Sequence, residues 1–267
     1  MLNIIIPTLA RIDNQVTLAN IPRKYHEQVT LVVQEHEYAE VVGKYPSVNV
    51  WCLPHGTKGI AWTRYHIAHH YKGQRVFIMD DDLKFVRVNG ETLKAAPVTE
   101  EEFGEMIDQI ELKMDEYLFG GLSTHNTPPS DKEFSECTRI YTNVFYSEKF
   151  DPDQVDWGTD HVLMPEDFHV TLQLLKQGEK NVVFNWFRAN PSATQSKGGC
   201  ETFRTLENHN RGQEILAELH PEHVSVYEKE VPSGPWKGAM KKALKIKWKQ
   251  AYTDSQRNEQ SLEEFFG

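Results

Sequence analysis

The sequence lacks the features that are typical of secreted proteins, of proteins with a structural metal site and of membrane proteins. Its three cysteines, Cys52, Cys137 and Cys200, are odd in number and far apart, which argues against a disulfide framework or a zinc site. No apolar run approaches the roughly 20 residues of a membrane span. The first residues have no basic segment and only a short apolar run, unlike a signal peptide. We therefore expect a cytoplasmic protein with no membrane association.

An excess of positive charge is also missing. The formal net charge is -10, and this argues against a protein that coats nucleic acid. One segment departs from this balance, because residues 237–249 contain six lysines and no acid, with Trp236 and Trp248 beside them. The run has two interpretations, a solvated face of a helix or strand and a local site for a polyanion. Its lysines are Lys237, Lys241, Lys242, Lys245, Lys247 and Lys249.

The first half alternates compact apolar runs with helical stretches, the order of a parallel α/β sheet. The runs predict strands at Leu2–Ile6, Val29–Val33, Val48–Cys52 and Val76–Met79. The stretches between them predict helices at Asn14–Asn20, Glu37–Gly43 and Ile60–Tyr71. Ligands of such sheets bind at the carboxyl ends of the strands, so the polar residues after each strand are the first candidates for a site.

The second half continues with mixed elements and shows no linker, so we expect a single domain over residues 1–267. Helix Glu100–Tyr117 should begin with a capping box of Thr99 and Glu102. A second helix, Glu166–Gln177, should end at Gly178. Further patterns predict strands at Arg139–Tyr146 and Val182–Phe187, loops at Thr124–Asp131 and Asn190–Gly199, and a helix at Glu201–Leu219.

Three adjacent carboxylates, Asp80, Asp81 and Asp82, follow the fourth predicted strand. Such a run repels itself unless a cation neutralises it. On an extended chain Asp80 and Asp82 would share one side, which suits Mg²⁺ or Mn²⁺ with added phosphate oxygens. A solvated acidic turn is the plain alternative. A phosphatase D-x-D-x-T motif is disfavoured, because Lys84 stands where that motif has threonine.

A second carboxylate pair, Glu166 and Asp167, opens a predicted helix. Acids in a first turn complement the helix dipole, and that alone would explain them. The functional interpretation needs one carboxylate in the ligand crevice as a general base, which would deprotonate an acceptor hydroxyl while a diphosphate leaves.

The two pairs in this order resemble the pattern of GT-A glycosyltransferases, up to about Gly178. Ile4–Thr8 is similar to the opening strand and IPT of that fold, and residues 59–64 are similar to a G-x-x-x-x-R helix start. The resemblance implies a Rossmann-like, mostly parallel central sheet flanked by helices, with a C-terminal extension. It divides the domain into a nucleotide-sugar half at 1–90, an acceptor and base half at 91–235 and a basic tail at 236–267.

The same resemblance implies roles for individual residues. Asp167 would be the catalytic base, assisted by Glu166, which favours inversion at the sugar carbon. Asp80 and Asp82 would hold Mn²⁺ or Mg²⁺, and His209 is a candidate third ligand, although a plain surface histidine is the alternative. The nucleotide-sugar, expected to carry UDP, would be bound by Pro7, Thr8, Arg11, Gln34, Glu35, Gly59, Arg64, Asp80 and Asp81; Asp81, on the opposite side of the strand, could equally be structural.

Several phrases are similar to a narrower group, the phage enzymes that glycosylate modified pyrimidines in DNA, known as TET-associated glycosyltransferases and DNA arabinosyltransferases. Examples are Arg11–Gln15, Val33–Glu37, Met79–Phe85, Lys197–Cys200 and Lys247–Tyr252. The resemblance implies transfer of glucose or arabinose to a hydroxymethyl or hydroxyl group in DNA, in the host cytoplasm, with no obligate protein partner. The lysine run and Lys197 would then contact DNA phosphates.

Two alternatives stay open on the sequence. A GT-A enzyme could act on a glycan or a small molecule, and the lysine run would then be only a solvated face. A non-catalytic nucleotide-sugar or DNA-binding module is the other. It would have no need of a general base, so Asp167 speaks against it.

Overall fold

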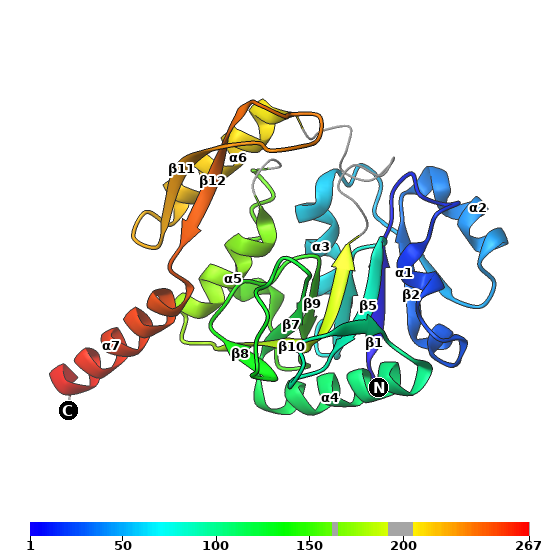
Figure 1. Ribbon diagram of the computed structural model, residues 1–267, viewed down its shortest axis with the longest axis horizontal. Helices are drawn as coiled ribbons and strands as arrows, with labels where there is room; N and C mark the ends of the chain where they lie inside the picture. Colours follow the sequence, from blue (N-terminus) through cyan, green and yellow to red (C-terminus); the bar gives the residue numbers. More distant parts are fainter. Residues whose placement is uncertain (162–164, 192–204, 267) are drawn as a thin grey trace.

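The computed structural model describes residues 1–161, 165–191 and 205–266 and shows an α/β fold around one large sheet (Figure 1). Its ten strands run in the order β3-β2-β1-β4-β9-β7-β10-β5-β6, with β8 paired to β10. The predicted α/β class is confirmed. The elements up to β4 are β1 Asn3–Pro7, α1 Val16–Ala19, η1 Arg23–Gln28, β2 Val29–Val33, α2 Glu35–Lys44, β3 Asn49–Cys52, α3 Gly59–His70 and β4 Val76–Met79.

The first four strands pair in parallel, as the sequence predicts, in the order β3-β2-β1-β4. Beyond β4 the sheet becomes mixed, because β9 enters antiparallel between β4 and β7, and β5 runs antiparallel to β10. The strands and helices of this part are β5 Leu83–Val88, β6 Ala95–Pro97, α4 Glu100–Glu116, β7 Phe119–Ser123, β8 Phe134–Glu136, β9 Asn143–Tyr146, η2 Pro152–Gln154, α5 Glu166–Lys176 and β10 Asn181–Pro191.

Strand β1 explains how the core has two sides. Ile4 and Ile6 belong to the cluster that contains the apolar stripe of α4, whereas Ile5 packs with Ile67 of α3 and Leu174 of α5. Successive side chains of a strand point to opposite faces, so a continuous run of isoleucine serves both layers. The capping box of α4 is present as predicted, and Gly178, with φ 88°, follows the end of α5.

Two predicted elements of the second half have different bounds in the structure. The strand expected at Arg139–Tyr146 begins only at Asn143, because Thr142 has φ 64°, outside the extended region. Strand β10 is longer than expected and includes Asn190 and Pro191 of the predicted loop. The rest of that loop, with Lys197, lies outside the described residues, as do residues 201–204 of the last predicted helix.

The C-terminal part is a helix, a hairpin and a final helix, namely α6 Leu206–Leu219, β11 Val224–Glu230, β12 Met240–Ile246 and α7 Trp248–Phe266. Strands β11 and β12 form a separate two-stranded sheet beside α6, and α7 extends away from the body (Figure 1). Apolar residues of all four elements pack on Leu172 and Leu175 of α5. Among the described helices, none is long and apolar enough to cross a membrane.

Gly120 provides a test of this packing. A Cβ atom at Gly120 in β7 would overlap the ring of Phe145 and the carbonyl oxygen of Val182, so Gly120→Ala should destabilise the fold by about 1–3 kcal/mol. The matched control is Gly43→Ala in α2, where a Cβ meets no atom and the change should be neutral or stabilising. Urea unfolding of both variants measures these free energies. Equal stabilities of the two variants would contradict the close packing at Gly120.

Candidate active site

The aspartate run lies at the carboxyl end of β4, facing the loop that follows β1. Thr8 Oγ1 donates a hydrogen bond to Asp81 Oδ2 at 2.8 Å. Arg11 Nη1 contacts Asp81 and lies 3.2 Å from Asp82 Oδ2. The sequence predicted that Asp80 and Asp82 share one side because the chain is extended, but the chain is not extended here. Residues 81 and 82 form a turn, so the alternation of an extended chain stops at Asp80.

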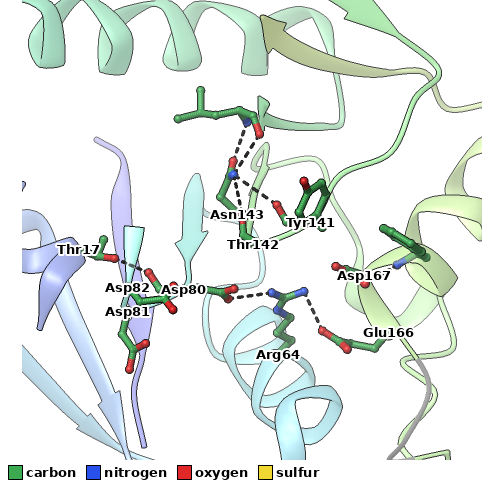
Figure 2. Close-up of polar contacts among 12 residues, drawn as sticks. Thr17, Arg64, Asp80, Asp81, Asp82, Tyr141, Thr142, Asn143, Glu166 and Asp167 are labelled. Atoms are coloured by element: carbon green, nitrogen blue, oxygen red, sulfur yellow. Dashed lines mark hydrogen bonds and ion pairs between the residues drawn. The ribbon is translucent and has the colours of Figure 1, made fainter. Parts of the chain in front are cut away.

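Thr17 holds this turn in place, and the sequence analysis missed it. Its Oγ1 donates to the carbonyl oxygen of Asp80 at 2.5 Å (Figure 2). The same Oγ1 accepts from the amide of Leu83 at 2.8 Å. The sequence contains little indication of this role, because a threonine within a predicted helix belongs to no recognisable motif. Its effect is to join α1 to both ends of the Asp81–Asp82 turn.

Arg64 joins the two carboxylate pairs (Figure 2). From α3, its Nη2 lies 3.3 Å from Asp80 Oδ1 and its Nη1 lies 2.8 Å from Glu166 Oε1. The residue is only 5% exposed. Asp167 follows Glu166 at the start of α5, and its Oδ1 accepts from the amide of Phe168 at 2.9 Å. Residues more than 80 positions apart in the chain thus share one guanidinium.

The environment shifts Asp80 and Asp167 toward the neutral form. Burial raises the pKa of Asp80 to about 7, although Arg64 opposes the rise, and the neighbouring carboxylates of Asp82, Asp81 and Glu166 add to it. Burial also raises the pKa of Asp167, Glu166 adds to the rise, and Arg64 again opposes it. A carboxylate with a pKa near neutrality is suited to accept a proton at physiological pH.

A small cavity of about 10 Å³ lies between α3, β9 and α5. Arg64, Tyr146, Glu166 and Asp167 supply its polar lining. A volume of this order holds about one water molecule. Burial raises the pKa of Tyr146, so its hydroxyl stays protonated beside the carboxylates. Tyr146 is a second residue that no motif in the sequence indicated. A tyrosine at the end of a predicted strand is most simply interpreted as part of the hydrophobic core.

The predicted nucleotide residues lie at the ends of β1 and β2 and at the start of α3. Pro7 ends β1, Gln34 caps α2, and Gly59 begins α3 with φ 79°. Glu35 is exposed, and its Oε2 lies 2.7 Å from His55 Nδ1. Beside them is an open hollow of about 520 Å³, lined by residues 10–14, Glu37 and Glu40. Glu37 shapes it by accepting from the Ala10 amide at 2.7 Å.

Asp80 and Asp82 are the predicted ligands of a divalent cation, and their carboxylates are close enough for Asp82 to raise the pKa of Asp80. Within the described ranges, no group of three or more histidine, cysteine and acidic side chains is arranged to hold a metal. His209 lies on α6, where its Nε2 contacts the carbonyl oxygen of Lys242 at 3.0 Å and its ring packs near Trp236. Its role as a ligand stays a prediction. Two crowded carboxylates still fit Mg²⁺ or Mn²⁺, which takes its other ligands from water and phosphate.

The predicted DNA-contacting lysines of the run lie on the hairpin and at the start of α7. Lys242, which is partly exposed, is bound to α6, because its Nζ pairs with Glu214 and its amide donates to Asn210 Oδ1 at 2.8 Å. The others extend to the surface to different degrees, and Lys237, Lys245, Lys247 and Lys249 are exposed. Contact with DNA stays a prediction for all of them.

The family follows from a comparison with known proteins. A model of the TET-associated glycosyltransferase family matches residues 2–199. The chain belongs to this family. It is therefore a glycosyltransferase, and the resemblance seen in its motifs is confirmed.

The phage relatives carry a more specific name. A protein of Enterobacteria phage T6 named beta-glucosyl-HMC-alpha-glucosyl-transferase is 28% identical to this glycosyltransferase over 234 residues, 83% of this chain and 82% of its own. The protein of the same name from Enterobacteria phage T2 is 27% identical with the same coverage.

The chain is also similar to solved structures. S. aureus TarS 1-349 in complex with UDP-GlcNAc has a TM-score of 0.48 at 15% identity, over 81% of this chain and 65% of TarS. Glucosyl-3-phosphoglycerate synthase from Mycobacterium tuberculosis, bound to Mg²⁺ and UDP, has a TM-score of 0.48 at 8% identity, over 92% and 87% of the two chains.

The raised pKa of Asp167 predicts that this residue lowers stability at neutral pH. Between the ordinary carboxyl pKa and the raised value, the folded state binds more protons than the unfolded state, so stability falls as pH rises. Asp167→Asn removes this loss, while Arg64 keeps Asp80 and Glu166 as partners. The variant should melt a few degrees higher at pH 8, since 1 kcal/mol corresponds to about 2–4 °C in a chain of this size.

The comparison is made by thermal melts at several pH values. The advantage of the variant should shrink as pH falls to 5, because the wild-type carboxyl is then protonated. Asp108→Asn, on the exposed face of α4, is the matched control and should show no such trend. An advantage that is absent or independent of pH would contradict the assignment.

Proposed function

We propose that this glycosyltransferase transfers glucose or arabinose from a UDP-sugar to a hydroxymethyl or hydroxyl group on a modified pyrimidine in phage DNA. The single observation that carries the chemistry is the guanidinium of Arg64, which brings Asp80 of the donor half beside Glu166 and Asp167. The names of the two phage relatives support a glucosyl group and an acceptor built on HMC.

The donor half would bind the nucleotide-sugar at the carboxyl ends of β1 and β4. Thr8 and Arg11 fix the Asp81 carboxylate, so the chain bends and Asp82 is presented beside Arg11. Asp80 and Asp82 would hold Mn²⁺ or Mg²⁺. When bound, such a cation would neutralise charge on the diphosphate leaving group. The hollow beside Arg11 would receive part of the nucleotide.

Asp167 would act as the general base. Its raised pKa lets it take the proton of the acceptor hydroxyl at neutral pH. The hydroxyl oxygen forms a bond to the anomeric carbon, the bond from that carbon to the diphosphate breaks, and the electron pair leaves with the diphosphate. Attack opposite the leaving group would invert the sugar carbon, which gives a beta product from UDP-glucose, whereas the two phage relatives are named for an alpha linkage. Glu166 stays paired with Arg64 and orients the start of α5.

The acceptor is tested by mass measurement of nucleosides. DNA that contains hydroxymethylcytosine is incubated with the protein, Mn²⁺ and either UDP-glucose or UDP-arabinose, then digested. We expect a mass gain of one sugar residue on the modified nucleoside and none on unmodified DNA. A protein that releases UDP with a glycan or small-molecule acceptor, but modifies no DNA with either donor, would contradict the proposal.

Asp167→Asn tests the base. The variant keeps the hydrogen bond to the Phe168 amide but cannot take a proton, so transfer should fall by about 10²–10⁴-fold. Binding of UDP-sugar, measured by calorimetry, should stay near wild type because Asp80, Asp82 and Arg11 are untouched. Asp108→Asn serves again as the control. Wild-type rates in Asp167→Asn would rule out the assignment.

Asp82→Asn tests the metal donor set. Loss of one carboxylate should weaken Mn²⁺-dependent binding of UDP by at least tenfold, because a carboxylate is a far better ligand for a hard cation than an amide. Calorimetry with UDP in Mn²⁺ and in EDTA separates the effects. Wild-type protein should lose affinity in EDTA, and the variant should lose less. Equal affinity of both proteins in Mn²⁺ would contradict a role for Asp82.

A further inference from the structure

One face of the β11–β12 hairpin carries only positive charges, and one of its lysines lies outside the lysine run of the sequence. Residues paired across an antiparallel ladder point to the same side. One face of the hairpin therefore carries the pairs Ser225 with Lys245, Tyr227 with Ala243 and Lys229 with Lys241. We call these six residues the outer face. It contains three lysines and no acid.

The opposite face of the hairpin carries the structural contacts. Its pairs are Val224 with Ile246, Val226 with Leu244, Glu228 with Lys242 and Glu230 with Met240. Val224, Leu244 and Ile246 pack with α6, and Lys242 pairs with Glu214 of that helix. Every acid of the two strands is therefore on the α6 side. The two faces therefore differ in packing and in charge, and the face that is free of α6 carries only basic charges.

Lys229 and Lys241 are directly opposite one another on the outer face. Like charges in this position destabilise a sheet, because the side chains of a cross-strand pair lie close together. The protein as a whole has a net charge of -10, so a repulsive basic pair goes against the general composition. Tyr227, 49% exposed, lies between this pair and Lys245. Basic side chains around an exposed aromatic ring are a common surface for a nucleic-acid backbone.

The outer face is also connected to the catalytic helix. Phe168 follows Asp167 on α5, and its ring lies 5.3 Å from that of Trp248, which begins α7 directly after β12. His169 Nδ1 lies 2.8 Å from His220 Nε2 beyond the end of α6. These contacts fix the hairpin relative to the start of α5. A ligand held by the hairpin is thereby held relative to Asp167.

The position of the hairpin agrees with this coupling. Strands β4 and β10 run in the same direction, since β9 is antiparallel to β4 and to β7, and β7 is parallel to β10. The carboxyl ends of β4 and β10 therefore lie at one edge of the sheet. Figure 1 shows the hairpin and α6 on the side of the molecule toward which β10 points. The hairpin thus stands beyond the edge that holds Asp80.

We propose that the outer face of the β11–β12 hairpin binds the phosphate backbone of the DNA acceptor, with Lys229, Lys241 and Lys245 as the contacts. This rests on the proposed function, because it takes DNA as the acceptor. It changes the sequence prediction in two ways. Lys229, which lies outside the lysine run, joins the site, and Lys242, which the run includes, belongs to the fold.

The test replaces Lys229, Lys241 and Lys245 together with glutamine. The matched control replaces Lys94, Lys149 and Lys176, three exposed lysines elsewhere, and changes the net charge equally. Binding of a fluorescent duplex is followed by anisotropy from 50 to 200 mM salt. The outer-face variant should bind roughly 10- to 100-fold more weakly at low salt. Its plot of log K against log salt should lose about 3 units of slope, one for each phosphate contact.

The control variant should match wild type in both affinity and slope. Equal affinity and slope in the outer-face variant would overturn the proposal. So would an equal loss in the control, which would show that only net charge matters. Vesicles that contain phosphatidylserine test the other large polyanion. If the outer-face variant loses vesicle binding but binds DNA as wild type does, the surface serves membranes and the proposal is wrong.

Transfer assays separate this proposal from the proposed function. With hydroxymethylcytosine DNA, the outer-face variant should show a KM for DNA raised about tenfold or more, with kcat near wild type at saturating DNA. If wild type transfers sugar to DNA and the variant keeps the wild-type KM, the hairpin proposal alone fails. If wild type transfers to no DNA, the proposed function fails, and the anisotropy measurements still decide whether the outer face binds a duplex.

Discussion

The buried guanidinium of Arg64 is the contact on which the rest of the site depends. A buried charge is stable only when it is paired with an opposite charge. Arg64 forms ion pairs with two carboxylates from distant parts of the chain. Lysine could not do this equally well, because it presents a single point of charge rather than a planar fork. The donor aspartates at the end of β4 and the acids at the start of α5 are therefore held as one unit. Removing Arg64 would leave Asp80 and Glu166 without their shared counterion, whereas Asp82 would keep Arg11.

The single positive charge of Arg64 does not neutralise all the carboxylates around it. Asp80 and Asp167 both have raised pKa values, since burial and neighbouring carboxylates together outweigh the attraction of Arg64. The molecule thus accepts local instability where it needs reactive carboxylates, a familiar compromise of active sites. The same excess of negative charge makes the end of β4 receptive to a cation. In the proposed mechanism, proton uptake at Asp167 and cation binding at Asp80 and Asp82 would both respond to this excess of negative charge.

The sequence predicted the parallel half of the fold well, because runs such as Ile4–Ile6 are apolar on both faces and have one obvious environment. It also placed Asp80 at the carboxyl end of β4, whereas Asp167, at the start of α5, was assigned to the same site only by the resemblance to GT-A enzymes. It failed where long-range pairing decides the local geometry. The turn at residues 81 and 82 depends on Thr17, and the antiparallel entry of β9 depends on neighbours far away in sequence. Neither has a local signature.

The lysine run is a second case in which long-range strand pairing decides what the sequence alone does not show. Read along the chain, residues 237–249 form one basic segment, and all six lysines look equivalent. The pairing of β12 with β11 divides them, because alternate residues face opposite ways and only one face of the hairpin is free of α6. Strand pairing therefore assigns Lys242 to the contact with α6 and brings Lys229, which precedes the run, beside Lys241. Since the hairpin and α7 both pack on α5, a backbone held by these lysines would be positioned by the helix that carries Asp167.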